Sequence, residues 1–332
     1  MLSTRQKIQK LFSQSEDWTV VQLTKELKVS KQLIHRILND FIADGTLIKL
    51  GLPPKTVYRS LLYASLVHEE ALLPLDAPKH KDADFLQTHF LLITETGEYL
   101  EGLNGFTIWC QKRSLPLEKT IKEFKETRKK YAAFYNVNGL VNGTEKIKTT
   151  KGFDAIYIDQ LYYLDFYAIE RFGKTKLGTI LHFAKQGQNK FLMHILLDAI
   201  KKQVFDFIKI HKIDAVGFVP PTIKRELQLM HFIQNGLELT LPIVQIQKIS
   251  GLIAVPQKSL NKIDERINNA NKTFTIPELN SYNKILLIDD AVGSGATLNQ
   301  IARKIKEKRI AKHIDAIALV GSFKGFDVIT DV

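Results

Sequence analysis

The most constraining stretch of this 332-residue chain is Lys284–Leu298, which reads KILLIDDAVGSGATL. Its first part, Ile285–Ile288, is a short continuous apolar run, which is typical of a strand buried on both faces of a parallel sheet. Two adjacent carboxylates, Asp289 and Asp290, follow at the expected end of that strand. A loop of small residues comes next, and helical spacing begins at Thr297. The stretch therefore predicts a strand, an acidic pair, a phosphate-sized loop and a helix N-terminus in succession.

This order of elements is suited to a binding site for a phosphorylated sugar. Neighbouring carboxylates such as Asp289 and Asp290 can accept hydrogen bonds from the two vicinal hydroxyls of a ribose. Glycines let a loop bring several backbone N–H groups onto one phosphate, and the new helix adds its N-terminal dipole. Ligands of α/β sheets also bind beyond the carboxyl ends of strands. The residues expected to bind the phosphate are Ala291, Val292, Gly293, Ser294, Gly295, Ala296 and Thr297. The other interpretation is a chance acidic turn between a strand and a helix.

The stretch resembles the phosphoribosyl pyrophosphate (PRPP) motif of type I phosphoribosyltransferases, in which an apolar strand and two acids precede Thr/Ser-Gly-x-Thr. The matching residues are Asp289, Asp290, Ser294, Gly295 and Thr297. The resemblance implies binding of PRPP or a nucleoside monophosphate and, in an active enzyme, displacement of pyrophosphate at the ribose anomeric carbon. Asp289 and Asp290 would then be catalytic, because carboxylates stabilise a cation-like sugar. Magnesium would come with the ligand, bridging pyrophosphate and ribose hydroxyls with few direct protein ligands.

Two flanking segments resemble ComF-type phosphoribosyltransferases, and the similarity spans residues 165 to 325 approximately. The segment Phe218–Pro221, followed by Lys224 and Arg225, lies where this family has its pyrophosphate loop. Both cations are therefore candidates to bind diphosphate oxygens. A second segment would be a mobile loop that closes over the ligand, with Arg266 or Lys258 against pyrophosphate. Its signature is matched by Gln257, Leu260, Arg266, Asn269 and Phe274, with one extra residue before Arg266.

The chain departs from these families at two points. Several purine-base enzymes have a third acid, serving as a base toward the purine, where this chain has Gly293. That difference argues against hypoxanthine-type salvage and leaves the acceptor unidentified. ComF-type proteins commonly have an N-terminal cysteine zinc ribbon, which the single cysteine of this chain, Cys110, cannot form.

Residues 1–62 predict three helices followed by a β-hairpin. Apolar residues recur at helical spacing, Ser30 is a predicted N-cap, and Gly45 is a predicted helix stop. Strands are expected over residues 46–50 and 56–60. This order resembles a winged helix-turn-helix domain, in which the third helix enters the major groove of DNA.

Burial of the apolar face of the third helix turns its polar side chains outward, where they could read bases or bind phosphates. The residues expected on this helix are Lys31, Gln32, His35 and Arg36. Flanking phosphates could be held from the hairpin by Lys49, Lys55 and Arg59. The other interpretation is a solvated charged face used for protein contacts.

The fold class expected is multidomain, with an α/β phosphoribosyltransferase-type parallel sheet over residues 151–332. Residues 63–150 predict a connecting α+β module that could support a homodimer. Within it we expect a strand and turn over 90–100 with which 105–111 could pair, a helix over 117–135, and turns or a hairpin over 136–150. Trp109 and Cys110 are expected to be packing residues. In the sheet domain we expect helices over 224–235 and 298–308 and a strand over 241–249.

The whole chain has a net charge of +12 and a pI near 9.4, which favours an anionic partner such as nucleic acid or phosphate. No signal peptide or membrane span is seen, and the single cysteine fits a reducing compartment, so a cytoplasmic location is expected. The leading hypothesis is a phosphoribosyltransferase-like protein coupled to a DNA-binding domain. One alternative is a transcription regulator that senses PRPP or a nucleotide without turnover. A further alternative is a phage-defence effector.

Overall fold

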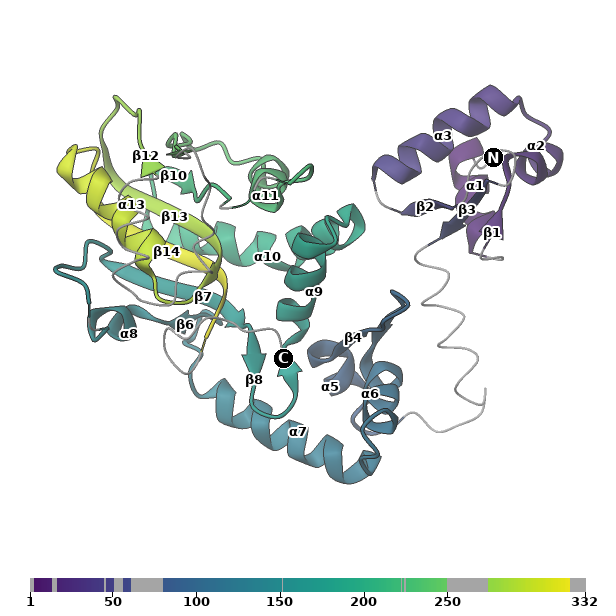
Figure 1. The fold of residues 1–332 in the computed structure, drawn as a ribbon, viewed down its shortest axis with the longest axis horizontal. Coiled ribbons are helices and arrows are strands. Elements are labelled where there is room, and N and C mark those ends of the chain that lie inside the picture. Colours follow the sequence, from purple (N-terminus) through teal and green to yellow (C-terminus); the bar gives the residue numbers. More distant parts are fainter. Residues whose placement is uncertain are drawn as a thin grey trace. The chain divides into compact units, whose positions relative to one another are not determined.

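The computed structural model describes residues 3–13, 17–44, 46–50, 56–60, 80–150, 152–221, 223, 225–249 and 274–322 (Figure 1). The chain divides into two compact units. The first is Met1–Ile121 with Asn189–Leu192, and the second is Lys122–Gln188 with Met193–Val332. Our three-part division at residues 62 and 150 stays a prediction. None of the described helices has the combined length and apolar composition that crossing a bilayer requires.

The N-terminal part of the first unit contains three helices and a small antiparallel sheet. The helices are α1 (Thr4–Phe12), α2 (Val20–Leu27) and α3 (Lys31–Ala43). The strands are β1 (Asp17–Trp18), β2 (Leu47–Leu50) and β3 (Val57–Ser60), in the order β1-β3-β2. The three helices and the hairpin strands β2 and β3 were expected from the sequence. Strand β1, which lies between α1 and α2, was not.

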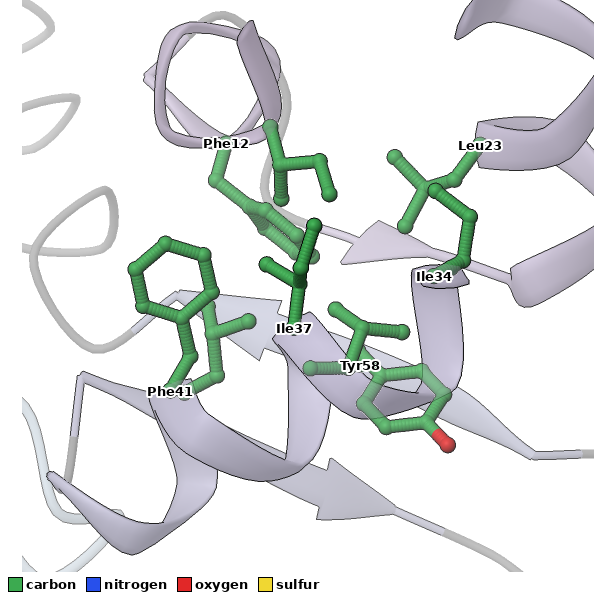
Figure 2. Close-up of a cluster of buried hydrophobic side chains, with 9 residues drawn as sticks. Phe12, Leu23, Ile34, Ile37, Phe41 and Tyr58 are labelled. Carbon is green, nitrogen blue, oxygen red and sulfur yellow. The ribbon is translucent and has the colours of Figure 1, made fainter. Parts of the chain in front are cut away.

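Side chains from all three helices and from the hairpin form one apolar core (Figure 2). Its buried members are Ile8, Phe12, Leu23, Ile34, Ile37, Leu38, Phe41, Leu47 and Tyr58. Hydroxyl groups fix the helix starts, because Ser3 and Thr19 form capping boxes with Gln6 and Gln22. The Ser30 hydroxyl accepts a hydrogen bond from the Leu33 N–H at 3.3 Å, so the predicted N-cap of α3 is confirmed. Gly45, the predicted stop, lies outside the described residues.

The rest of the first unit corrects one prediction. Strands β4 (Leu91–Ile93) and β5 (Tyr99–Glu101) pair with each other, and they follow helix α5 (Ala83–His89). The segment 105–111 is not a strand but belongs to helix α6 (Gly102–Gln111). Helical spacing places Phe106, Trp109 and Cys110 together in the core, at 0%, 6% and 2% exposure. Trp109 and Cys110 are therefore buried packing residues, as the sequence predicted.

The second unit is built on a five-stranded sheet with the order β10-β13-β14-β7-β6. Strands β10 (Ala215–Phe218), β13 (Tyr282–Val292), β14 (Ala311–Gly321) and β7 (Gln160–Phe166) are parallel, and the edge strand β6 (Val141–Asn142) is antiparallel to β7. Ile285–Ile288 are fully buried in β13, as the continuous apolar run predicted. The second unit is thus a mixed α/β structure whose central strands run in one direction.

Helices connect and flank these strands in the second unit (Figure 1). They are α7 (Leu117–Ala132), α8 (Thr144–Lys148), α9 (Lys176–Gln186), α10 (Lys190–His211), α11 (Leu229–Leu237) and α13 (Ala296–Glu307), and the first residues of α7 and α10 belong to the first unit. The short pairs are β8 (Ala168–Ile169) with β9 (Gly173–Lys174), and β11 (Gln247–Lys248) with β12 (Phe274–Thr275).

Three boundaries in the second unit differ from the sequence predictions. The expected helix over 224–235 begins only at Leu229, since the preceding Leu227 N–H bonds Gln188 instead. The expected strand over 241–249 is reduced to a bridge at Ile243 and to β11, and Pro242 inside it lacks a ladder N–H. The hairpin or turns expected over 136–150 contain β6 and α8.

Helix α9 starts in close contact with the carboxyl end of β7. The Thr175 N–H donates to the Tyr167 carbonyl at 3.0 Å, and the Thr175 hydroxyl donates to the Phe166 carbonyl at 2.6 Å. The same hydroxyl accepts from the Gly178 N–H at 3.0 Å. A Cβ on Gly178 would lie 2.1 Å from the Tyr167 carbonyl oxygen, so only glycine permits this approach.

We predict that Gly178→Ala lowers the free energy of unfolding of the second unit by about 1–3 kcal/mol, because the helix must move away from β7. Urea denaturation followed by circular dichroism measures the change. Gly293→Ala is the matched control, since a Cβ there meets no atom within 4 Å. Equal stability of the two variants would contradict this account of α9.

Candidate functional site

The acidic pair lies near the carboxyl end of the hydrogen-bond ladder between β13 and β14. Asp289 pairs in register with Ala318, and Ala291 pairs with Val320. The strand therefore continues through both acids to Val292, whereas the sequence placed its end before them. The Asp290 N–H donates to an Asp289 carboxylate oxygen at 2.8 Å. The ladder and this bond fix the backbone that carries the two carboxylates.

A tight loop connects the strand to α13. Gly295 has φ of 73°, the left-handed region that favours glycine, and it occupies the N-cap position without a side-chain cap. The buried Ser294 hydroxyl accepts from the Ala296 N–H at 3.3 Å. The next N–H groups, of Thr297 and Leu298, belong to the first helical turn and have no carbonyl partner within the helix. The loop and helix start thus offer donors and a positive dipole end to an anion.

One cation meets the acidic pair from α9. The ammonium group of Lys185 hydrogen-bonds the second carboxylate oxygen of Asp290, and the two side chains are 25% and 13% exposed. Burial and the charge of Asp290 raise the pKa of the Asp289 carboxyl to about 7, while the positive charge of Lys185 acts in the opposite direction. Asp289 therefore changes charge near neutral pH, which an ordinary aspartate does not.

The end of α9 also holds the loop that follows β10. The Arg225 guanidinium donates to the Gln186 side-chain oxygen at 2.8 Å, and the Leu227 N–H donates to the Gln188 side-chain oxygen at 2.9 Å. Lys185 and Gln186 are adjacent in sequence, so they connect Asp290 and Arg225 to one short segment. Arg225 is thus brought to the same edge of the sheet as the acidic pair.

The sequence did not point to Lys185 or Gln186. Neither belongs to a spacing pattern or motif, and a lysine near the end of a helix is usually a surface residue that favours the helix dipole. No signal in the sequence alone identifies either residue as part of this site. Only the parallel register of the sheet, together with the start of α9 at β7, brings them to Asp290 and Arg225.

Several predicted site residues lie outside the described part of the chain. These are Lys224, Lys258 and Arg266 of the expected pyrophosphate site and Lys55 of the expected hairpin surface. Gln257, Leu260 and Asn269 of the ComF-like signature also lie outside it, whereas Phe274 is buried in β12.

The predicted polar surface of the first unit is present on α3. Lys31, Gln32, His35 and Arg36 are all exposed on that helix, and Lys49 is exposed on β2. Arg59 differs from them, because its guanidinium donates to both carboxylate oxygens of Asp17, at 2.7 and 2.8 Å. That pair partly compensates the charge of Arg59, although its role toward DNA stays a prediction.

Comparison with known proteins carries no argument about the fold or the function of this chain. No family model and no curated protein matches this chain. Among solved structures, it is similar to a hypoxanthine phosphoribosyltransferase from Staphylococcus aureus, with 14% identity and a TM-score of 0.24, over 41% of this chain and 67% of that chain. We therefore base the function on the geometry around Asp289 and Asp290.

We predict that Asp289 titrates near pH 7 in the wild-type protein, which carbon-detected NMR of the side-chain carboxyl groups can measure. Asp290→Asn should lower the pKa of Asp289, because it removes the neighbouring negative charge. Lys185→Met should raise it, because it removes the positive charge that favours ionisation. Asp17 is an internal control, since its hydrogen bonds with Arg59 lower its pKa below the ordinary value. If Asp289 has the pKa of an ordinary aspartate, the described burial of its carboxyl group beside Asp290 and Lys185 is wrong.

Proposed function

We propose that the site at the carboxyl end of β13 binds PRPP or a nucleoside 5′-monophosphate, as type I phosphoribosyltransferases do. The observation that carries this proposal is the adjacent pair Asp289 and Asp290 near the carboxyl end of a buried parallel strand, followed within a few residues by the Gly295 turn and the start of α13. A ribose diol needs two acceptors a few ångströms apart, and a phosphate needs convergent N–H donors. This segment supplies both.

In this proposal the two ends of the ligand are held by different groups of the same segment. The ribose hydroxyls donate to the carboxylates of Asp289 and Asp290. The phosphate accepts hydrogen bonds from the N–H groups of the loop and first helical turn, with the hydroxyls of Ser294 and Thr297 nearby. Arg225, held by Gln186, is available for a diphosphate group.

Magnesium fits this set of side chains as a ligand-borne ion. The side chains available here offer carboxylate oxygens, the type of ligand atom that magnesium prefers. These oxygens would contact the water molecules that magnesium retains. When bound, the ion would neutralise charge on a leaving pyrophosphate. The chain's own acids would stabilise positive charge that develops on the sugar.

Binding and turnover are separate questions for this site. A phosphoribosyltransferase would release pyrophosphate from PRPP in the presence of its acceptor, and a regulator that senses PRPP would bind it without release. Pyrophosphate release with a panel of bases and DNA distinguishes the two. A phage-defence effector is a further alternative, which gene neighbourhood can test.

We predict that Asp289→Asn combined with Asp290→Asn weakens magnesium-dependent PRPP binding by about 100-fold or more, given about 1.5–3 kcal/mol for each hydrogen bond to a charged group. Isothermal calorimetry measures the affinity. The control is Asp206→Asn, which changes an exposed carboxylate paired with Lys202 on α10. Equal affinity of the double variant and the wild type would refute the assignment.

We also propose that the first unit binds DNA through α3, as a winged helix-turn-helix domain. The supporting observation is that Lys31, Gln32, His35 and Arg36 share the exposed face of α3, while Ile34, Ile37 and Leu38 fill the core. The order of three helices and an antiparallel sheet agrees with such a domain. The combined protein would couple a nucleotide-binding site to DNA.

We predict that Lys31→Ala with Arg36→Ala weakens DNA binding and lowers the slope of log affinity against log salt by about 2, if both cations contact phosphates. Fluorescence anisotropy over a range of salt concentrations measures this slope. The control is Lys7→Ala with Lys10→Ala, which removes the same charge from the exposed side of α1. If both double variants lose the same affinity for DNA, α3 is not the recognition helix. If the wild type binds no DNA from a genomic pool, α3 serves a protein contact.

A further inference from the structure

Helix α9 runs along the edge of the sheet where the ligand is proposed to bind. It starts at the end of β7, with Gly178 against Tyr167, and the His182 ring hydrogen-bonds the Tyr167 hydroxyl at 3.1 Å. One turn later Lys185 reaches Asp290 on β13. His182 and Lys185 are three residues apart and therefore share a face of the helix. This face of α9 is directed toward the carboxyl ends of the strands.

The bond between Lys185 and Asp290 conflicts with ligand binding as proposed. It occupies one of the carboxylate oxygens that a ribose hydroxyl would use. The ammonium group is only partly exposed, so it cannot leave the carboxylate without finding another partner or full hydration. A ligand that displaces Lys185 must therefore supply a new anionic partner close by.

A sugar diphosphate with its magnesium ion meets this requirement. Asp290 would hold Lys185 less strongly once a dication carried by the ligand compensated the negative charge of the acidic pair. The diphosphate brings several charged oxygens to the same edge of the sheet. Lysine suits such an exchange, because its ammonium group is a compact charge on a flexible four-carbon stem. Gln186, the residue after Lys185, hydrogen-bonds Arg225, which ties a second cation to the end of α9.

We propose that Lys185 binds the diphosphate group of the ligand, exchanging Asp290 for phosphate oxygens when the ligand enters. This inference rests on the proposed function of the site. It makes Lys185 a residue that selects sugar diphosphates over sugar monophosphates. It also assigns two roles to one side chain: counter-ion of Asp290 in the empty site, and phosphate ligand in the occupied one.

The test compares Lys185→Met and Lys185→Arg with the wild type by calorimetry in the presence of magnesium. The probes are PRPP, pyrophosphate and ribose 5-phosphate. Lys202→Met is the matched control, because Lys202 also pairs with an aspartate, Asp206, but at an exposed site on α10. Thermal unfolding of each variant shows whether it is folded.

Lys185→Met is expected to weaken binding of PRPP and pyrophosphate by about 10-fold or more, the usual range for a lost charged hydrogen bond. Ribose 5-phosphate should bind within about threefold of wild type or tighter, because Asp290 is freed while its phosphate is held by the loop. Lys185→Arg should retain most of the PRPP affinity, and Lys202→Met should leave all three affinities unchanged.

Three results would overturn the inference. If Lys185→Met binds PRPP as well as Lys202→Met does, Lys185 is only a counter-ion. If PRPP and ribose 5-phosphate are weakened equally, Lys185 acts by holding Asp290 in place. Both results leave the proposed function intact, provided that the wild type binds PRPP. Absence of PRPP and pyrophosphate binding by the wild type would overturn the inference and the proposed function together.

Discussion

The parallel register of the central strands is the constraint on which the second unit depends. Phe218 of β10 pairs with Ile288 of β13, and Ile288 pairs in turn with Ile317 of β14. Parallel strands place their carboxyl ends at one edge, so loops far apart in sequence become neighbours there. The acidic pair, the Arg225 loop and the end of α9 meet because of this register. A slip of one residue in the pairing of β13 would move the side chains of Asp289 and Asp290 each to the other face of the sheet.

Local patterns were sufficient to predict much of the fold from the sequence. The run Ile285–Ile288 predicted a strand buried on both faces, since strands with one solvated face commonly alternate apolar and polar residues. Ser30 identified the start of α3, because a hydroxyl at the N-cap satisfies a backbone donor that the helix leaves free. Such signals depend on neighbours in sequence. The PRPP-like motif is also a local signal, because its strand, acids and loop are contiguous in the sequence.

Features that depend on distant contacts were not predictable. The segment 105–111 is wrongly predicted as a strand for a local reason, because a short apolar segment with residues such as Phe106 and Trp109 is compatible with either a helix or a strand. The pair between Lys185 and Asp290 joins residues 105 positions apart, and that between Arg59 and Asp17 joins residues 42 apart. No spacing rule connects such partners, although they decide which charges remain available for ligands.

The charges around Asp289 bear on both binding and turnover in the proposed function. Gly293 leaves the position of the third acid without a carboxyl group, although a Cβ there would meet no atom within 4 Å. The difference is therefore chemical and not imposed by packing. A pKa of about 7 would let the Asp289 carboxylate accept a proton near neutral pH. Departure of Lys185 would raise that pKa, and arrival of a dication would lower it. If Lys185 exchanges Asp290 for a diphosphate as proposed, the same exchange would change the charge of Asp289 and with it the ability of this carboxyl group to act as a base.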